Sequence, residues 1–156
     1  MRYLVDETEL EPEDSLSAYR AALAWAVPRS DRFVLLIEPE VYDDHDYLLR
    51  LYALGKAALP ADSRLDDMVQ VTGRPGAALI QELTRKQSPP KATSGDLCPV
   101  QQATLFEGER RLYACYDYGR TQILDLTPEE ADDLRPALEQ QGLNGGILKP
   151  APPYIT

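Results

Sequence analysis

The sequence predicts an α+β domain in which helices pack on a largely antiparallel sheet. Three observations support this class: the order of helix-like and strand-like segments, three consecutive strands near the C-terminus, and a helix start directly after them. With 156 residues and 44% hydrophobic residues, the chain can bury one substantial core. We therefore expect a single domain over residues 1–143 and an extended, proline-rich tail over residues 144–156.

The C-terminal strands form a predicted meander. Short segments rich in aliphatic and aromatic residues lie at 103–107, 111–117 and 121–126. The pairs Gly108-Glu109 and Gly119-Arg120 separate them, and each pair fits a two-residue hairpin turn in which glycine takes a positive φ.

That register assigns the side chains of the meander to two faces. Leu105 shares one face with Ala114 and Ile123, whereas Phe106 lies on the other face with Tyr113. Both faces are then apolar, so we expect the sheet to be covered on both sides.

A helix start follows the meander. Thr127 and Glu130 have the spacing of a capping box, and Pro128 suits the first helical position. Gly142 marks the stop, and Pro136 predicts a kink or a break within the helix.

The first half of the chain alternates strands and helices. Strands are predicted at residues 2–5 and 32–37. An amphipathic helix is predicted after the acidic residues 11–14, with Leu16 to Val27 at helical spacing, and Pro28 stops it. A second helix is expected to begin at Asp43 or Asp44 and to run to about Leu59.

The net charge of −10 is concentrated in the first third of the chain. Residues 1–46 hold 12 acids and 4 bases, a balance of −8, whereas the other 110 residues hold 14 acids and 12 bases. An acidic surface repels nucleic acid and attracts basic proteins, although acidic surfaces also serve solubility alone.

The most acidic stretch, residues 38–46, contains five acids beside the only histidine, His45. Carboxylates with one imidazole can bind a divalent metal, but no metal-ligand spacing is present. Acids at a helix N-terminus stabilise the helix dipole, and we prefer this structural interpretation. The sequence therefore predicts no metal and no cofactor.

Catalytic residues are not predicted either. Any Ser-His or Cys-His mechanism would need His45, whose neighbours are acids in a solvated turn. Cys98 and Cys115 do not form a metal-type pair, and they suit a reducing compartment.

Residues 65–86 allow three interpretations. In the first, a strand leads through Gly73, Arg74 and Gly76 into a helix, and this loop binds a phosphate group of a metabolite or nucleotide. In the second, the segment resembles a helix-turn-helix, which implies DNA binding through Arg85 and Lys86. In the third, which we prefer, it is an ordinary strand-turn-helix.

From these patterns we expect a non-enzymatic, acidic protein-binding module of inhibitor, immunity-protein or chaperone type. Its basic partner protein is expected to contact Trp25 and the acids of residues 38–46: Glu38, Glu40, Asp43, Asp44 and Asp46. No apolar run has the length of a membrane span and the N-terminus lacks a signal-peptide core, so we expect a cytoplasmic protein of bacterial type. Apolar residues of the tail, such as Ile147 and Tyr154, can dock on the domain or on a second chain, as in a homodimer.

Overall fold

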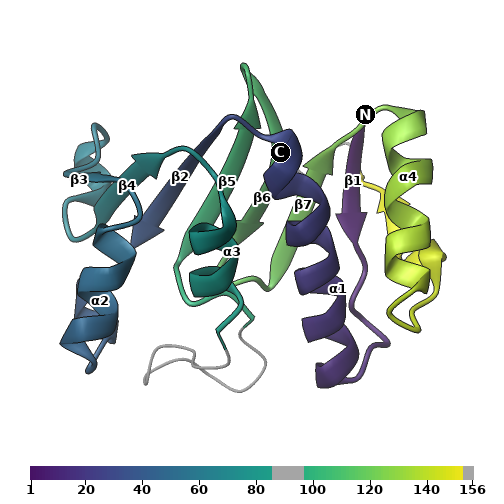
Figure 1. Cartoon of the computed structure of the whole chain (residues 1–156), viewed down its shortest axis with the longest axis horizontal. Coiled ribbons are helices and arrows are strands. Elements are labelled where there is room, and N and C mark those ends of the chain that lie inside the picture. The colour runs from purple at the N-terminus through teal and green to yellow at the C-terminus, as the bar shows by residue number, and fades with distance from the viewer. Residues whose placement is uncertain (86–96, 153–156) are drawn as a thin grey trace.

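A computed structural model describes residues 1–85 and 97–152, and in this part of the chain four α-helices pack on one eight-stranded sheet (Figure 1). The strands are β1 (Arg2–Val5), β2 (Arg32–Ile37), β3 (Lys56–Ala58), β4 (Val69–Gly73), β5 (Gln102–Glu107), β6 (Arg110–Tyr116), β7 (Thr121–Asp125) and β8 (Leu148–Pro150). The helices are α1 (Pro12–Ala26), α2 (His45–Tyr52), α3 (Ala77–Leu83) and α4 (Pro128–Glu139). Each neighbouring pair of strands is antiparallel, so the expected α+β class with a C-terminal meander, β5–β6–β7, is confirmed.

The strand order places the first two strands of the chain far apart in the sheet. The order is β3-β4-β2-β5-β6-β7-β1-β8, and four antiparallel steps lead from β1 to β2. An even number of steps restores the direction, so β1, β6 and β2 run the same way (Figure 1). The loops after these three strands consequently leave the sheet at the same edge.

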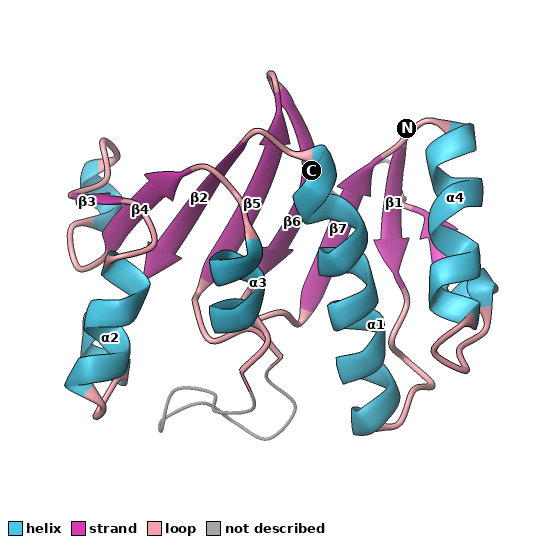
Figure 2. Cartoon of the chain, in the orientation of Figure 1, coloured by secondary structure: helices cyan, strands magenta, loops and turns pink. Residues whose placement is uncertain are grey.

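All four helices lie on one face of the sheet, where α1 and α4 are side by side (Figure 2). The largest side chains of the core, including Tyr19, Phe33 and Tyr113, are fully buried between this helix layer and the sheet. On the opposite face Val34, Leu36 and Phe106 are only partly buried. Our expectation of cover on both sides is wrong for the α-helices of the described chain, all of which lie on one face, whereas on the second face the segment that includes Pro60 and Leu65 lies beside Val34 and Leu36.

A β-bulge changes the pairing of β5 with β6. Phe106 pairs with Arg111, as the two-residue turn requires, but Leu105 then pairs with Tyr113 and Leu112 is skipped. Because of the extra residue, Leu105 points toward the α-helices together with Tyr113, and Phe106 points to the opposite face of the sheet. We call this opposite face, which carries no α-helix in the described chain, the helix-free face. The expected assignment of Leu105 and Phe106 to faces is therefore wrong.

The loop between β6 and β7 has four residues instead of the expected two, since Tyr116 pairs with Thr121. Asp117, Tyr118 and Gly119 have φ values of 52°, 58° and 89°. A positive φ costs a non-glycine residue about 1–2 kcal/mol, so other contacts must support this loop. The N–H groups of Leu97 and Cys98 donate to the Tyr118 carbonyl at 2.9 and 3.0 Å and supply that support.

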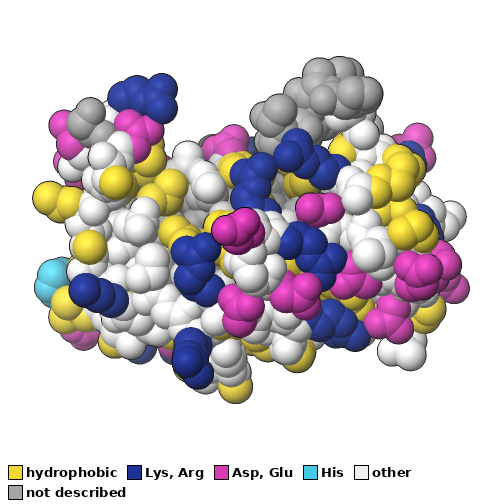
Figure 3. Space-filling model, turned by 90° about the horizontal axis from the view of Figure 1, so that it is seen from above, with side chains coloured by type: hydrophobic (Ala, Val, Ile, Leu, Met, Phe, Trp, Pro, Cys, Tyr) yellow, Lys and Arg dark blue, Asp and Glu magenta, His cyan; other side chains and the backbone are white. Residues whose placement is uncertain are grey.

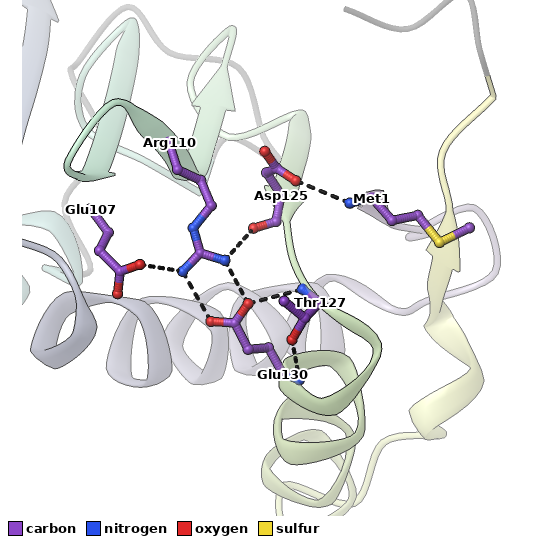
Figure 4. A network of polar contacts seen from close by, with 6 residues as sticks. All are labelled: Met1, Glu107, Arg110, Asp125, Thr127 and Glu130. Carbon is purple, nitrogen blue, oxygen red and sulfur yellow. Dashed lines mark hydrogen bonds and ion pairs between the residues drawn. The ribbon is translucent and has the colours of Figure 1, made fainter.

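The predicted capping box at the start of α4 is present (Figure 4). The Glu130 N–H donates to Thr127 Oγ1 at 3.2 Å, and the Thr127 N–H donates to Glu130 Oε1 at 2.9 Å. Arg110 of β6 donates to both Glu130 oxygens, at 2.5 and 3.0 Å, so the cap also ties the helix to the sheet. Helix α4 runs without a break through Pro136.

Helix α2 ends at Tyr52 and not near Leu59, as we expected. The chain turns back at Gly55 to form the edge strand β3, and a Cβ on Gly55 would lie 2.1 Å from the Thr72 carbonyl oxygen. Only glycine fits this close crossing, and Leu59 is left 78% exposed.

The segment between residues 65 and 86 is a strand-turn-helix. A helix-turn-helix needs a helix before Gly73, but the structure has β4 there, followed by α3. Lys86 lies outside the described residues.

At the C-terminal end of the described chain, residues 145–147 form a 3₁₀ turn and β8 adds to the sheet beside β1. The described chain has no helix that is both long and apolar enough to cross a bilayer.

Candidate functional site

Two acidic segments that are distant in sequence lie at the same end of the sheet, where the strands that precede them end. Residues 6–14, which follow β1, contain six acids and no base, and residues 38–46, which follow β2, contain five acids and no Lys or Arg. Because β1 and β2 run in the same direction, both segments leave the sheet at the edge drawn lowest in Figure 1. We call the acids of these two segments the acidic edge. Four strand spacings, about 19 Å, separate β1 from β2.

Two of the predicted residues in the second segment have structural contacts. The Asp44 side chain caps α2 by accepting from the Tyr47 N–H at 3.0 Å, as the dipole interpretation requires. Glu38 accepts a hydrogen bond from the Tyr118 hydroxyl at 2.7 Å and thereby joins this segment to the β6–β7 loop.

The remaining acids of this segment face solvent. Glu40, Asp43 and Asp46 are exposed, as is His45. Within the described chain no ion pair or hydrogen bond engages the carboxylates of Asp43 and Asp46. These groups are therefore available to an external cation.

The first segment was not among the predicted site residues, although six acids without a base could have indicated it. Glu9, Glu11, Glu13 and Asp14 are exposed, and the last two lie in the first turn of α1. Asp6 forms an ion pair with Lys149 of β8 at 2.5 Å. The hydrogen bond from Lys149 lowers the pKa of Asp6 far below its ordinary value, so Asp6 stays ionised.

A hollow of about 490 Å³ lies beside this ion pair. It is lined by residues of the loop after β1, including Thr8 and Glu9, and by Asn144 and Gly146 before β8. Its walls are about half polar and half apolar.

Glu7 differs from its neighbours because it points into the protein. Gln122, which is 1% exposed, donates from Nε2 to Glu7 Oε1 at 3.0 Å, and Gln122 Oε1 accepts from the Tyr113 hydroxyl at 2.8 Å. Burial raises the pKa of Glu7 to about 7, although the hydrogen bond from Gln122 acts in the opposite direction. The charge of Glu7 therefore changes near neutral pH.

The acids do not converge on a metal. In residues 1–85 and 97–152 no three His, Cys, Asp or Glu side chains are arranged to hold an ion. Asp43 precedes the helix, Asp44 is its N-cap and Asp46 lies in its first turn, and these acids present a surface of separate charges.

Trp25 lies away from the acidic edge and is 6% exposed. Its Nε1 donates to Asp133 of α4 at 3.2 Å, and the Arg29 guanidinium lies 4.3 Å from the ring centroid. Trp25 therefore packs between α1 and α4 and offers little surface to a partner, so we leave it out of the proposal below.

Of the two glycines in the candidate phosphate loop, Gly73 is needed for packing, whereas the structure shows no need for glycine at position 76. A Cβ on Gly73 would lie 3.0 Å from the Phe33 ring and 3.3 Å from Gly55 Cα, so Gly73 permits the close crossing at the edge of the sheet. Gly76 has nothing within 4 Å of a Cβ position, and its φ of −168° is open to any residue. Arg74 is exposed at the end of β4. Helix α3 spans only seven residues. A shallow hollow of about 360 Å³ adjoins the start of the loop and is lined by Asp31, Arg32 and Arg74, so an acid shares it with the two cations.

The opposite end of the molecule has a different character. Figure 3, a view from above, shows Lys and Arg side chains gathered across the middle of that end among Asp and Glu side chains. The acidic edge is therefore a property of one end of the molecule and not of the whole surface. A comparison of the chain with protein-family models, with curated proteins and with solved structures found no match.

Proposed function

We propose that this protein is a non-enzymatic binding module that engages a basic partner protein through the acidic edge. The observation that carries the proposal is the placement of two segments at the same end of the sheet, after two strands that run in the same direction. Together these segments hold 11 acids and no Lys or Arg. An inhibitor, an immunity protein or a chaperone of a basic protein would use such a surface.

Electrostatics favours this use of the edge. Like charges at one end of a molecule create a local potential that attracts a basic protein and speeds association by about 10- to 1000-fold at low salt. Because the Debye length is about 8 Å at physiological ionic strength, the attraction depends on salt.

The geometry favours a contact along the length of the edge. The two segments are fixed by β1 and β2, by the cap on α2 and by the Tyr118–Glu38 hydrogen bond, so their charges keep a constant spacing. A partner with basic groups about 19 Å apart, the width of four strand spacings, would engage both segments together.

The test is co-purification from the native host at low and high salt, with mass spectrometry of the bound proteins. We expect a basic partner that is released by salt. The variant Glu11→Lys/Asp43→Lys changes one exposed acid in each segment and should weaken its binding about tenfold or more.

The control is Glu109→Lys/Glu129→Lys, which changes the net charge equally with two exposed acids outside the acidic edge. It should bind as the wild type does, and thermal melts should show that both variants are folded. Equal binding by the edge variant and the control, or a complex that is insensitive to salt, would show that the acidic edge is not the docking surface.

A further inference from the structure

Two exposed arginines on the helix-free face are held by aromatic residues and not by acids. The Arg32 guanidinium lies 4.2 Å from the centroid of the Phe106 ring. Arg111 donates from Nη1 to the Tyr116 hydroxyl at 3.0 Å. In the described chain no carboxylate lies within ion-pair distance of either guanidinium. Both groups are thus oriented without being neutralised.

Strand register places these residues in one row. Arg32 pairs with Phe106 across β2 and β5, and Phe106 pairs with Arg111 across β5 and β6. Residues directly opposite each other in an antiparallel pair point to the same face. The face therefore carries a cation, an aromatic ring and a second cation in line, with the two cations about 10 Å apart, the width of two strand spacings.

Some arginines of the described chain have acid partners, although Arg20 and Arg74, like the two arginines of the row, have no carboxylate within ion-pair distance. Arg110, next in sequence to Arg111, binds Glu130 and Glu107, and Arg135 binds Asp132. The chain has 26 acids against 16 Lys and Arg, so acids are in excess. Arg32 and Arg111 nevertheless keep their N–H groups free of carboxylates.

Two hollows adjoin the row. One of about 320 Å³ lies next to Phe106 and Arg111, over Val34 and Leu36 of β2 and beside Leu65, and its walls are mainly apolar. A second, of about 180 Å³, lies on the other side of Arg111 and is mainly polar, with Glu109 and Asp125 in its walls. The larger hollow can accept an apolar side chain next to a guanidinium.

We propose that this face is a second binding surface and that its occupant is an acidic segment of a partner protein. The segment carries two carboxylates about 10 Å apart, one for Arg32 and one for Arg111, with an apolar side chain that enters the larger hollow. Aromatic contacts already orient the two guanidinium groups, so binding a carboxylate loses little further side-chain entropy. This inference is independent of the proposal for the acidic edge.

A protein segment suits the surface better than a nucleic acid does. Nucleic acids carry a phosphate at every nucleotide and need many cations along their path. Here the row supplies two unneutralised arginines, in a chain whose net charge is −10. A short segment with two carboxylates matches the two cations of the row and brings far fewer negative charges than a nucleic acid does.

The test is selection of short random peptides from a display library against three forms of the full chain. These are the wild type, Arg32→Gln/Arg111→Gln, and the control Arg50→Gln/Arg120→Gln, which removes the same charge from α2 and from the β6–β7 loop. Single-stranded RNA of random sequence is measured against the same forms, and thermal melts establish that each variant is folded.

We expect the wild type and the control to enrich peptides with two acids and an apolar residue. These peptides should bind Arg32→Gln/Arg111→Gln about tenfold or more weakly. A further variant, Phe106→Leu, keeps both charges and should weaken binding by removing the ring that orients Arg32. A basic partner of the acidic edge should bind the wild type, Arg32→Gln/Arg111→Gln and Phe106→Leu equally well. Its binding to the control can differ, because Arg120 lies at the acidic edge.

Two results would overturn the inference. One is enrichment that is the same, or absent, on the wild type and on Arg32→Gln/Arg111→Gln. The other is that RNA binds the wild type but not Arg32→Gln/Arg111→Gln, while no acidic peptides are enriched. That result would mean that the row binds phosphate groups.

Discussion

Single side chains in this protein often join elements that are distant in sequence. The Glu130 carboxylate accepts from the Thr127 N–H and from both terminal nitrogens of Arg110, so one group closes a helix cap and holds that helix against the sheet. The cap could be predicted because its two residues are three positions apart. The contact with Arg110, 20 residues earlier, could not, because no local pattern specifies it.

The cap permits a direct test at the residue scale. Thr127→Ala removes the acceptor for the Glu130 N–H and should lower the free energy of unfolding by about 1 kcal/mol. For a chain of this size the melting temperature should fall by about 2–4 °C. Thr127→Ser keeps the hydroxyl and should melt close to the wild type. Equal losses in both variants would show that packing of the threonine methyl, and not the hydrogen bond, provides the stability.

Glu7 gives a prediction about pH. Its pKa is raised from an ordinary 4.5 to about 7 because burial disfavours the carboxylate. The stability that it contributes is therefore fully present below about pH 4.5 and is lost as the pH rises through 7. Glu7→Gln keeps an acceptor for Gln122 but cannot ionise, so it should be more stable than the wild type above neutral pH and equal to it in acid.

Denaturant unfolding of both forms at about pH 5 and about pH 8 measures this difference. Because Glu7 is only partly buried, we expect the variant to gain about 1–2 kcal/mol at the higher pH, less than the full pKa shift implies. The other carboxylates are common to both forms and cancel. A difference that does not change with pH would mean that Glu7 has an ordinary pKa in the folded protein.

At the scale of helices and strands, the positions of most elements follow from local sequence patterns, but the details of the loops and pairings between them do not. The sequence located all three strands of the meander, but it missed the bulge between β5 and β6 and the length of the β6–β7 loop. Both features depend on contacts outside the hairpin. The Tyr118 carbonyl, for example, accepts from Leu97 and Cys98, which come from a different part of the chain.

The two positive-φ glycines of the meander separate a local effect from a tertiary one. Gly108 has a φ of 59° and open space around a Cβ position, so Gly108→Ala should cost about 1 kcal/mol. Gly119 has a φ of 89°, and a Cβ there would lie 2.9 Å from Leu97 Cβ. Gly119→Ala should therefore cost about 3 kcal/mol, because it adds overpacking to backbone strain. Chemical denaturation of both variants measures the difference, and similar costs would argue against close packing of this loop on residues 97–98.

At the scale of the whole molecule, the direction of the strands determines at which end of the sheet the acidic segments lie. The acids of residues 6–14 and 38–46 repel one another at the acidic edge, and salt screens this repulsion. Added NaCl should therefore raise the melting temperature. The variant Glu11→Gln/Asp43→Asn should melt higher than the wild type at low salt and should respond less to NaCl. Thermal melts over a series of salt concentrations measure both effects, and an equal response of the two forms would place the repulsion elsewhere.

The sequence by itself determined the α+β class, the meander, the capping box and the acidic character of the first third, because each rests on residues that are close along the chain. The tertiary structure alone decided the one-sided layer of α-helices, the placement of the two acidic segments at the same end of the sheet and the row of Arg32, Phe106 and Arg111. These features depend on which strands are neighbours and on the direction in which each one runs. Strand order is set by the packing of the whole core, so no stretch of a few residues contains it.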